Sequence, residues 1–201
     1  MKSKNYLKVF AFTLSLAVLN GCQSPKVLES TVENTSQNYW QNMEQKLAKI
    51  SVLKEQGRLG FISQNERGSC NYEFILENKD TTLELTSPIG SQIAFLKISQ
   101  DESSLNFNNQ YFKDKDPQVL LNKALGLNLP CDTLNKILLG IPNDDITRDK
   151  NGRIIFANID GYSVKYGQFK VFNGFALPSD LTIKNNQTTV KIKVNKVNEV
   201  N

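Results

Sequence analysis

The first hydrophobic pattern along the chain lies at its N-terminus. Lys2, Lys4 and Lys8 precede a mostly apolar run over residues 9–19. A basic segment followed by about ten apolar residues is typical of a secretory signal peptide, and such a run is too short to cross a bilayer unaided. Residues 1–21 are therefore predicted to be a signal peptide that is removed from the mature protein.

A cysteine follows this apolar run directly. Leu19-Asn20-Gly21-Cys22 fits a bacterial lipobox, in which the cysteine is acylated and becomes the new N-terminus after cleavage. Gly21 supplies the small residue before the cut, and Leu19 supplies an apolar residue further upstream. An ordinary secretory signal with a chance cysteine is the alternative. The lipobox is favoured, so Cys22 is predicted to carry a lipid anchor made of an N-acyl chain and an S-diacylglycerol group.

The segment after the cysteine changes character. Residues 22–35 are polar and of mixed composition, which predicts a flexible tether between the lipid and the folded part. Residues 36–201 are then predicted to form a single domain, because they are numerous enough to bury one sizeable core.

The domain begins with a helical pattern that gives way to a β pattern. From Trp40 to Leu53 apolar residues recur at spacings of three and four, which predicts an amphipathic helix over Gln37–Lys54. From Gly57 onward apolar and polar residues alternate over short segments, which predicts an antiparallel meander with one buried face. The predicted strands are Arg58–Ser63, Asn71–Glu77, Thr82–Thr86, Gln92–Ile98 and, more weakly, Ser104–Phe107.

A helical insert interrupts the strands. Asp116, followed by Pro117, can cap a helix that ends at Gly126, and Asp132 can cap a second helix that ends at Gly140. Strands then return, with hairpin-type dipeptides at 151–152 and 173–174. These later strands are predicted at 153–158, 162–169, 181–184 and 190–194.

These elements define the expected fold class, which is mainly β with helices (α+β). A single antiparallel sheet of about nine or more strands tends to curl. Helices placed against its concave side would enclose an apolar space, as a lid closes a container.

Charge and composition exclude some functions. Removal of residues 1–21 takes away three lysines and no acidic residue, which leaves 21 basic against 20 acidic residues and a net charge of +1. A nearly neutral protein lacks the electrostatic footprint of nucleic-acid binding. The sequence has no histidine, which disfavours the common hydrolase nucleophile pairs and most zinc sites.

Two cysteines remain after Cys22 is assigned to the lipid. Cys70 and Cys131 could form a disulfide in an oxidising compartment, but their separation in space cannot be inferred from the sequence. Two buried thiols acting as small hydrophobic residues are the favoured interpretation.

Acidic residues gather at Asp144, Asp145 and Asp149, close to Asn151-Gly152. A calcium loop aligned on that glycine would place Asn158 at the twelfth position, where a glutamate is required. The match fails, and a solvated turn is the favoured interpretation.

The segment from Thr86 to Ser91 joins two predicted strands. Pro88 fixes φ and Gly90 can adopt positive φ, so a tight turn is expected with Ile89 at its tip. Ile89 either folds back onto a core residue or protrudes as an apolar contact for a membrane or a partner. The turn alone does not choose between these.

The order of the motifs resembles the LolB family of outer-membrane lipoprotein receptors over nearly the whole chain. The lipobox cysteine and a helix bearing Trp40 come first. The motifs that carry the resemblance further are Gly57-Arg58-Leu59-Gly60-Phe61, Ser87-Pro88-Ile89-Gly90, Leu129-Pro130-Cys131-Asp132-Thr133-Leu134, Leu138-Leu139-Gly140-Ile141-Pro142, Gly161-Tyr162-Ser163-Val164-Lys165-Tyr166 and Leu177-Pro178. The chain departs from the family at Ile137, Tyr162 and Val197, where tryptophan is usual.

The resemblance implies an unclosed antiparallel β-barrel with an α-helical lid over a hydrophobic cavity. It implies a monomeric, non-enzymatic protein without a cofactor beyond its lipid, anchored to the periplasmic face of the outer membrane of a Gram-negative bacterium. Its partners would be the periplasmic carrier LolA, the acylated lipoproteins that LolA delivers, and the outer-membrane lipid into which they are inserted.

The resemblance also assigns roles to residues. Pro88, Ile89 and Gly90 would form the loop required for insertion into the membrane. Apolar and aromatic residues predicted on the sheet and the first helix are core residues first of all, and they line a cavity only if the interior is hollow. The residues expected to line an acyl-chain cavity are Trp40, Phe61, Phe74, Leu85 and Phe95.

Two other functions stay open at this point. One is an outer-membrane-anchored assembly or protein-binding lipoprotein with the same anchor but a filled core. The other is a carboxylate-dependent hydrolase that uses Asp144, Asp145, Asp149 or Asp160, which the lack of histidine and of a paired carboxylate motif disfavours.

Overall fold

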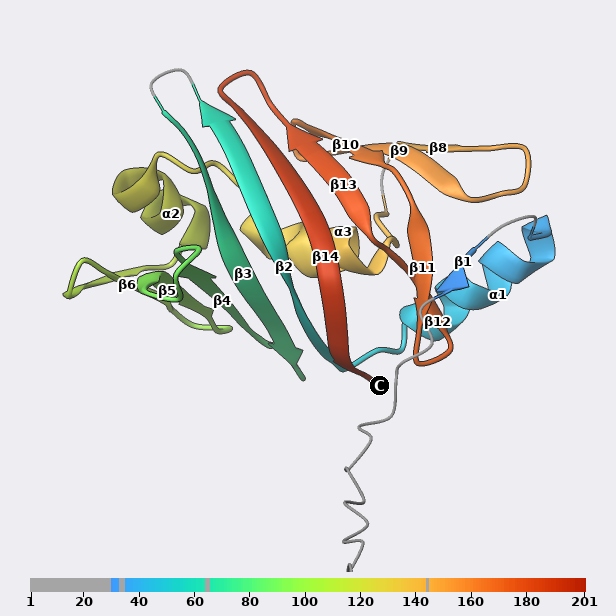
Figure 1. Ribbon diagram of the computed structural model, residues 1–201, viewed down its shortest axis with the longest axis horizontal. Coiled ribbons are helices and arrows are strands. Elements are labelled where there is room, and N and C mark those ends of the chain that lie inside the picture. The colour runs from blue at the N-terminus through green and yellow to red at the C-terminus, as the bar shows by residue number, and fades with distance from the viewer. Residues whose placement is uncertain (1–29, 33–34, 64–65, 144) are drawn as a thin grey trace, which may run out of the picture.

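A long antiparallel sheet dominates the computed structural model, which describes residues 30–32, 35–63, 66–143 and 145–201 (Figure 1). The predicted signal peptide, Cys22 and the first part of the tether lie outside the described residues. The eleven strands of this sheet are β2 (Val52–Ser63), β3 (Arg67–Glu77), β4 (Asp80–Thr86), β5 (Gln92–Ile98), β6 (Ser103–Phe107), β7 (Gln110–Asp114), β8 (Ile146–Arg148), β9 (Ile154–Ile159), β10 (Tyr162–Tyr166), β13 (Asp180–Lys184) and β14 (Thr188–Val200).

The sheet does not close on itself. Its strand order is β7-β6-β5-β4-β3-β2-β14-β13-β10-β9-β8, so β7 and β8 are its two edges. The pairing of β14 with β2 joins the C-terminal strands to the N-terminal meander. The expected mainly β fold with an unclosed antiparallel sheet is confirmed.

A smaller layer packs beside one end of this sheet. It consists of β1 (Ser30–Thr31), β11 (Phe169–Phe172) and β12 (Phe175–Pro178), together with helix α1 (Gln37–Leu47). Because Ser30 pairs with Val171, the chain joins the fold ahead of the domain boundary expected at Ser36.

Helix α1 is shorter than predicted. The Ser36 hydroxyl accepts a hydrogen bond from the Tyr39 amide at 3.4 Å, which caps the start of the helix as expected. The prediction that the helix continues to Lys54 is wrong, because β2 begins at Val52 and pairs with both β3 and β14. Leu53 continues the helical spacing by chance, and it is fully buried as a strand residue.

Alternation along the strands produces one buried face. Side chains such as Leu59, Phe74, Leu83 and Leu96 are at most 3% exposed and point to the same side, which we call the inner face. The side chains between them in each strand point to the outer face and are partly or fully exposed.

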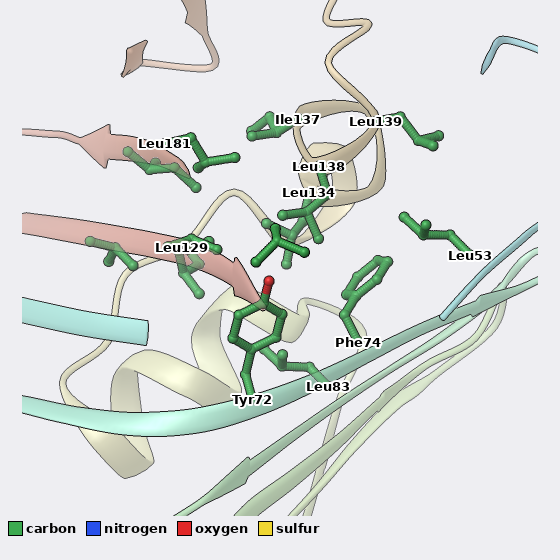
Figure 2. Packing of buried hydrophobic residues seen from close by; sticks show 14 of the residues in the cluster. Leu53, Tyr72, Phe74, Leu83, Leu129, Leu134, Ile137, Leu138, Leu139 and Leu181 are labelled. Carbon is green, nitrogen blue, oxygen red and sulfur yellow. The ribbon is translucent and has the colours of Figure 1, made fainter. Parts of the chain in front are cut away.

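Two short helices cover the inner face. Helix α2 (Pro117–Leu125) packs against β5, β6 and β7, while a 3₁₀ turn, η1 (Cys131–Thr133), leads into α3 (Leu134–Leu139). Figure 2 shows Leu134 and Leu138 of α3 reaching toward Tyr72 and Phe74 on β3. The helices therefore fill the space over the sheet, as a lid would.

The ends of these helices follow from local chemistry. The Asp116 carboxylate accepts hydrogen bonds from the amides of Gln118 and Val119 at 2.8 and 3.4 Å, as predicted, and Gly126 ends α2 with a φ of 60°. Gly140 ends α3 with a φ of 73°. The prediction that Asp132 caps this second helix is wrong, because Asp132 lies inside η1 and α3 begins only at Leu134.

The C-terminal half differs from the prediction in its strand boundaries. The strand expected over 162–169 is divided, because the Gly167 amide and the Gln168 amide donate to the backbone oxygen and the carboxylate of Asp180 and turn the chain. Strands β1, β7, β8 and β12 were not predicted, and of β11 only the first residue was. The turn at Asn173-Gly174, where φ is positive at both residues, joins β11 to β12 as its sequence predicts.

The glycine motif in β2 gives a test of this packing. A Cβ atom on Gly57 would lie 2.1 Å from the backbone oxygen of Lys193, whereas one on Gly60 would lie 3.9 Å from its nearest neighbour, the oxygen of Gly68. We expect Gly57→Ala to lower the free energy of unfolding by about 3 kcal/mol or more, and Gly60→Ala to change it by less than about 1 kcal/mol. Urea unfolding measures both, and equal effects of the two substitutions would contradict the packing of β2 against β14.

Candidate functional site

Four of the five side chains predicted to line a cavity belong to the buried core or its rim. Phe74 and Leu85 are 0% and 3% exposed on the inner face of β3 and β4. Phe61 is partly buried toward the end of the inner face of β2. Trp40 lies apart from them, on α1, with its ring 5.1 Å from the ring of Phe169.

The structure does not bring Phe95 to this face. Phe95 pairs with Glu84 across β4 and β5, while its neighbours Ala94 and Leu96 are the buried residues of its strand. Because successive side chains alternate between the two faces of a strand, Phe95 lies on the outer face. Its prediction as a cavity residue is therefore wrong. The prediction took the aromatic residue to lie on the buried face of β5, but the small Ala94 and its neighbour Leu96 lie on that face.

The interior is closely packed in this structure. Leu53, Phe74, Leu129, Ile137 and Leu138 are each at most 1% exposed. A pocket of about 590 Å³ lies instead at the surface, between α1 and the segment from Gly140 to Asn143. An acyl chain would have to displace some of these side chains to reach the interior, and the cavity itself stays a prediction.

One buried residue contradicts the apolar character of the inner face. Glu55 is 0% exposed on β2, where it faces the interior between Leu53 and Gly57. The Tyr72 hydroxyl donates a hydrogen bond to Glu55 Oε1 at 2.9 Å. The other carboxyl oxygen, Oε2, is buried without a hydrogen-bond partner.

Burial determines the charge of this carboxyl group. The loss of hydration raises the pKa of Glu55 from an ordinary 4.5 to about 8, although the hydrogen bond from Tyr72 opposes the rise. Glu55 is therefore protonated and neutral near pH 7. This buried position was not predicted, because the strand was expected to begin only at Arg58. Extending the alternation of Leu59 back to Leu53 would have placed Glu55 on the buried face.

The predicted insertion loop is ordered by its own hydrogen bonds. The Gly90 amide donates to the Ser87 backbone oxygen at 2.9 Å, and the Ser91 amide donates to the Ser87 hydroxyl at 3.1 Å. The Asn71 side-chain amide from β3 also donates to the Ser87 backbone oxygen, at 3.2 Å. Gly90 has a φ of 88°, as its sequence position suggested.

Ile89 protrudes from this ordered loop. Its side chain is 90% exposed, so of the two possibilities left open by the sequence the protruding one is correct. An isoleucine fixed in water by a hydrogen-bonded loop gains no burial within the fold. Among the described residues Ile89 is the most exposed of the large apolar side chains.

Two more exposed apolar residues lie toward the same end of the sheet. The β2–β3 hairpin, the β4–β5 loop and the β6–β7 turn all leave the sheet at this end, because consecutive strands are antiparallel. Ile62 at the end of β2 is 58% exposed, and Tyr111 at the start of β7 is 64% exposed. We call Ile62, Ile89 and Tyr111 together the exposed apolar end.

The other candidate residues have structural roles. Cys70 and Cys131 are free, buried thiols, and burial raises their pKa values to about 11 and about 12. The Asp149 carboxylate accepts hydrogen bonds from the amides of Asn151 and Arg153, which shapes the turn predicted there. Within the described residues no group of three or more histidine, cysteine or acidic side chains is arranged to hold a metal.

The positions at which the chain departs from the family pattern are packing positions. Ile137, Tyr162 and Val197 are 0%, 5% and 1% exposed. Tyr162 also donates a hydrogen bond to the Asn128 side chain, which lies in the segment between α2 and η1. All three side chains therefore pack inside the fold.

Comparison with solved structures defines the class of fold. A LolA superfamily protein from Nitrosomonas europaea superposes with a TM-score of 0.51 at 8% sequence identity, covering 82% of this chain and 93% of that one. The chain therefore shares with that protein the fold of an unclosed sheet covered by helices. Within the described residues no helix is both long and apolar enough to span a membrane.

Sequence comparison identifies the family within this class. The family model for the outer membrane lipoprotein LolB matches residues 53–196, so the chain belongs to the LolB family. It is 28% identical to the outer-membrane lipoprotein LolB of Pseudoalteromonas translucida, covering 92% of this chain and 91% of that protein. The corresponding protein of Aeromonas hydrophila is 27% identical, with 92% and 93% covered.

The buried carboxyl group predicts a pH-dependent stability. Unfolding returns Glu55 to water, where its pKa falls from about 8 to its ordinary 4.5, so the folded state binds more protons between these values. Stability should therefore decrease as the pH rises from 4.5 through 8, by an amount on the order of a few kcal/mol.

Glu55→Gln removes this titration while keeping a similar shape. Because only the wild type loses stability through this group as the pH rises, we expect the unfolding free energy of the variant, relative to that of the wild type, to increase from pH 4.5 to pH 8. Urea unfolding at several pH values measures it. A constant difference from pH 4.5 to 8 would show that the Glu55 carboxyl group is not buried in the folded protein.

Proposed function

We propose that this protein is a lipoprotein receptor of the outer membrane, anchored by lipid on Cys22, that accepts lipoproteins from the soluble carrier LolA and inserts them into the membrane. The single observation that carries the proposal is Ile89, an isoleucine that is 90% exposed on a loop fixed by hydrogen bonds. Membership of the LolB family supports it. The apolar inner face under α2 and α3 supplies the second component that such a receptor needs.

The acyl chains of the cargo determine what the receptor must do. Each buried CH₂ group is worth about 0.8 kcal/mol, so a protein with several acyl chains cannot cross an aqueous compartment unshielded. In the proposed receptor the chains take the place of lid side chains such as Leu134 and Leu138 on the inner face. Because one set of apolar contacts replaces another, this exchange needs little net free energy.

Transfer in one direction then follows from relative affinities. The receptor must hold acyl chains more tightly than the carrier does and less tightly than a bilayer does. A lid that competes for the inner face lowers the affinity of the interior, because its contacts must be broken first. The close packing of the interior is thus compatible with release into the membrane.

Release into the membrane would take place at the exposed apolar end. Ile89 would enter the interfacial region of the bilayer, with Ile62 and Tyr111 at the same end of the sheet. Apolar and tyrosine side chains both favour that region. Contact there would bring the interior next to the membrane and shorten the path of an acyl chain through water.

A protein-binding lipoprotein with a filled core is the alternative, and the packing of Leu53, Phe74 and Leu138 favours it. Binding of a fluorescent fatty-acid analogue by the mature protein carrying Cys22→Ala distinguishes the two functions. Uptake supports the receptor, whereas no uptake at any concentration below that of micelle formation supports the alternative.

Ile89→Asp tests the proposed insertion step. We expect this variant to fold with a stability within about 0.5 kcal/mol of the wild type, because the side chain is exposed. It should still receive a lipoprotein from LolA, but incorporation into outer-membrane vesicles should slow by about ten-fold or more, since the apolar contact of Ile89 with the bilayer is lost.

Ile89→Leu is the matched control, because it keeps an apolar side chain of the same size on the same loop. Its rate of incorporation should stay within about two-fold of the wild type, as expected for an exposed apolar exchange. Normal incorporation by Ile89→Asp would count against a role of this loop in insertion.

A further inference from the structure

The buried pair of Glu55 and Tyr72 has a hydrogen-bond donor that no acceptor within the described residues satisfies. Between them the neutral carboxyl group and the phenol carry two O–H donors. One is used in the bond of 2.9 Å between the Tyr72 hydroxyl and Glu55 Oε1. The second donor has no acceptor, because Glu55 Oε2 is buried without a partner.

The surroundings of the pair are otherwise apolar. Across the neighbouring strands Glu55 lies opposite Phe74 on β3 and Val197 on β14, which are 0% and 1% exposed. Gly57 makes room for the tyrosine, since a Cβ atom there would lie 2.7 Å from the Tyr72 ring. Figure 2 shows the Tyr72 hydroxyl pointing into the space between β3 and α3.

An unused donor in such a place is costly. Leaving a buried polar group unpaired costs about 1–3 kcal/mol, and an apolar side chain at position 55 would avoid that cost. The stability of the fold therefore does not explain why a carboxyl group is present at this position. A reason arises if the inner face also holds a ligand that offers an acceptor.

We propose that Glu55, held by Tyr72, donates a hydrogen bond to a carbonyl oxygen at the glycerol end of the bound lipid, and so selects ester-linked acyl chains. This inference rests on the proposed function, because it needs acyl chains on the inner face. An S-diacylglycerol group carries two ester carbonyls, which accept hydrogen bonds and cannot donate them. The pair therefore fixes the depth at which the chains sit, while Phe74 and its neighbours contact the hydrocarbon.

The neutral state of the carboxyl group supports this chemistry. With a pKa of about 8, Glu55 keeps its proton near neutral pH and can act as a donor. A carboxylate would only accept hydrogen bonds and would repel an ester carbonyl.

Two lipid probes that differ only in their carbonyl groups test the proposal. Dioctanoylglycerol carries two ester carbonyls, and dioctylglycerol, its diether analogue, carries none. Binding of each probe is measured by tryptophan fluorescence with the full mature chain carrying Cys22→Ala, in which Trp40 is the sole tryptophan. We expect the wild-type site to bind the diester about five- to ten-fold more tightly than the diether, as one hydrogen bond allows.

Substitutions at position 55 identify the donor. Glu55→Met replaces the carboxyl group by an apolar side chain of similar size, and it should bind both probes with the affinity that the wild type has for the diether. Glu55→Gln retains an N–H donor and an acceptor for Tyr72, and it should keep most of the preference for the diester.

Three results would overturn the proposal. Equal affinities of the wild type for the two probes would exclude a carbonyl acceptor, and an unchanged preference in Glu55→Met would show that another group provides it. If the wild type bound neither probe but took up a fatty-acid analogue, this inference would fail while the receptor function stood. If it bound none of the three ligands, the receptor function itself would fail, and with it this inference.

Discussion

The apolar inner face of an unclosed sheet is the constraint on which the rest of the structure depends. Because β7 and β8 do not pair, the sheet cannot bury this face by closing, so other elements must cover it. Helices α2 and α3 have nine and six residues, too few to be stable alone, so their structure depends on packing against the sheet. The contacts that complete the core are therefore also those that a bound acyl chain would replace.

Two residues depart most strongly from the pattern of apolar side chains inside and polar side chains outside. Glu55 places a carboxyl group in the interior, and Ile89 places an apolar side chain in water. Both are held there by defined hydrogen bonds, Glu55 by Tyr72 and the Ile89 loop by Ser87 and Asn71. Exceptions of this kind are expected where function competes with stability. In the proposed receptor, Glu55 positions the lipid inside the protein and Ile89 meets the membrane.

The sequence predicted much of this fold because alternation and helix caps are local signals. Strand β5 and helix α2 have the predicted bounds, since Gln92–Ile98 is a mostly apolar run between polar segments and Asp116 and Gly126 mark both helix ends. The start of β2 was missed, because Glu55 and Gly57 occupy inner-face positions at which an apolar side chain is expected, for reasons that depend on β3 and β14. The exposure of Ile89 could not be predicted from the sequence, since it depends on which side chains surround the loop. Phe95 misled the prediction because aromatic character does not reveal which face of a strand is buried.

Occupation of the inner face by acyl chains is the central claim, and a pair of phenylalanines tests it most directly. Phe61 and Phe95 are both partly buried, but they lie on the inner and the outer face of the same sheet. A photoreactive phenylalanine analogue is introduced at either position, and the protein is irradiated after it has received an acylated lipoprotein with labelled acyl chains. We expect cross-linking of the acyl chains at position 61 and background labelling at position 95. Equal labelling at the two positions, or labelling at position 95 alone, would contradict the claim.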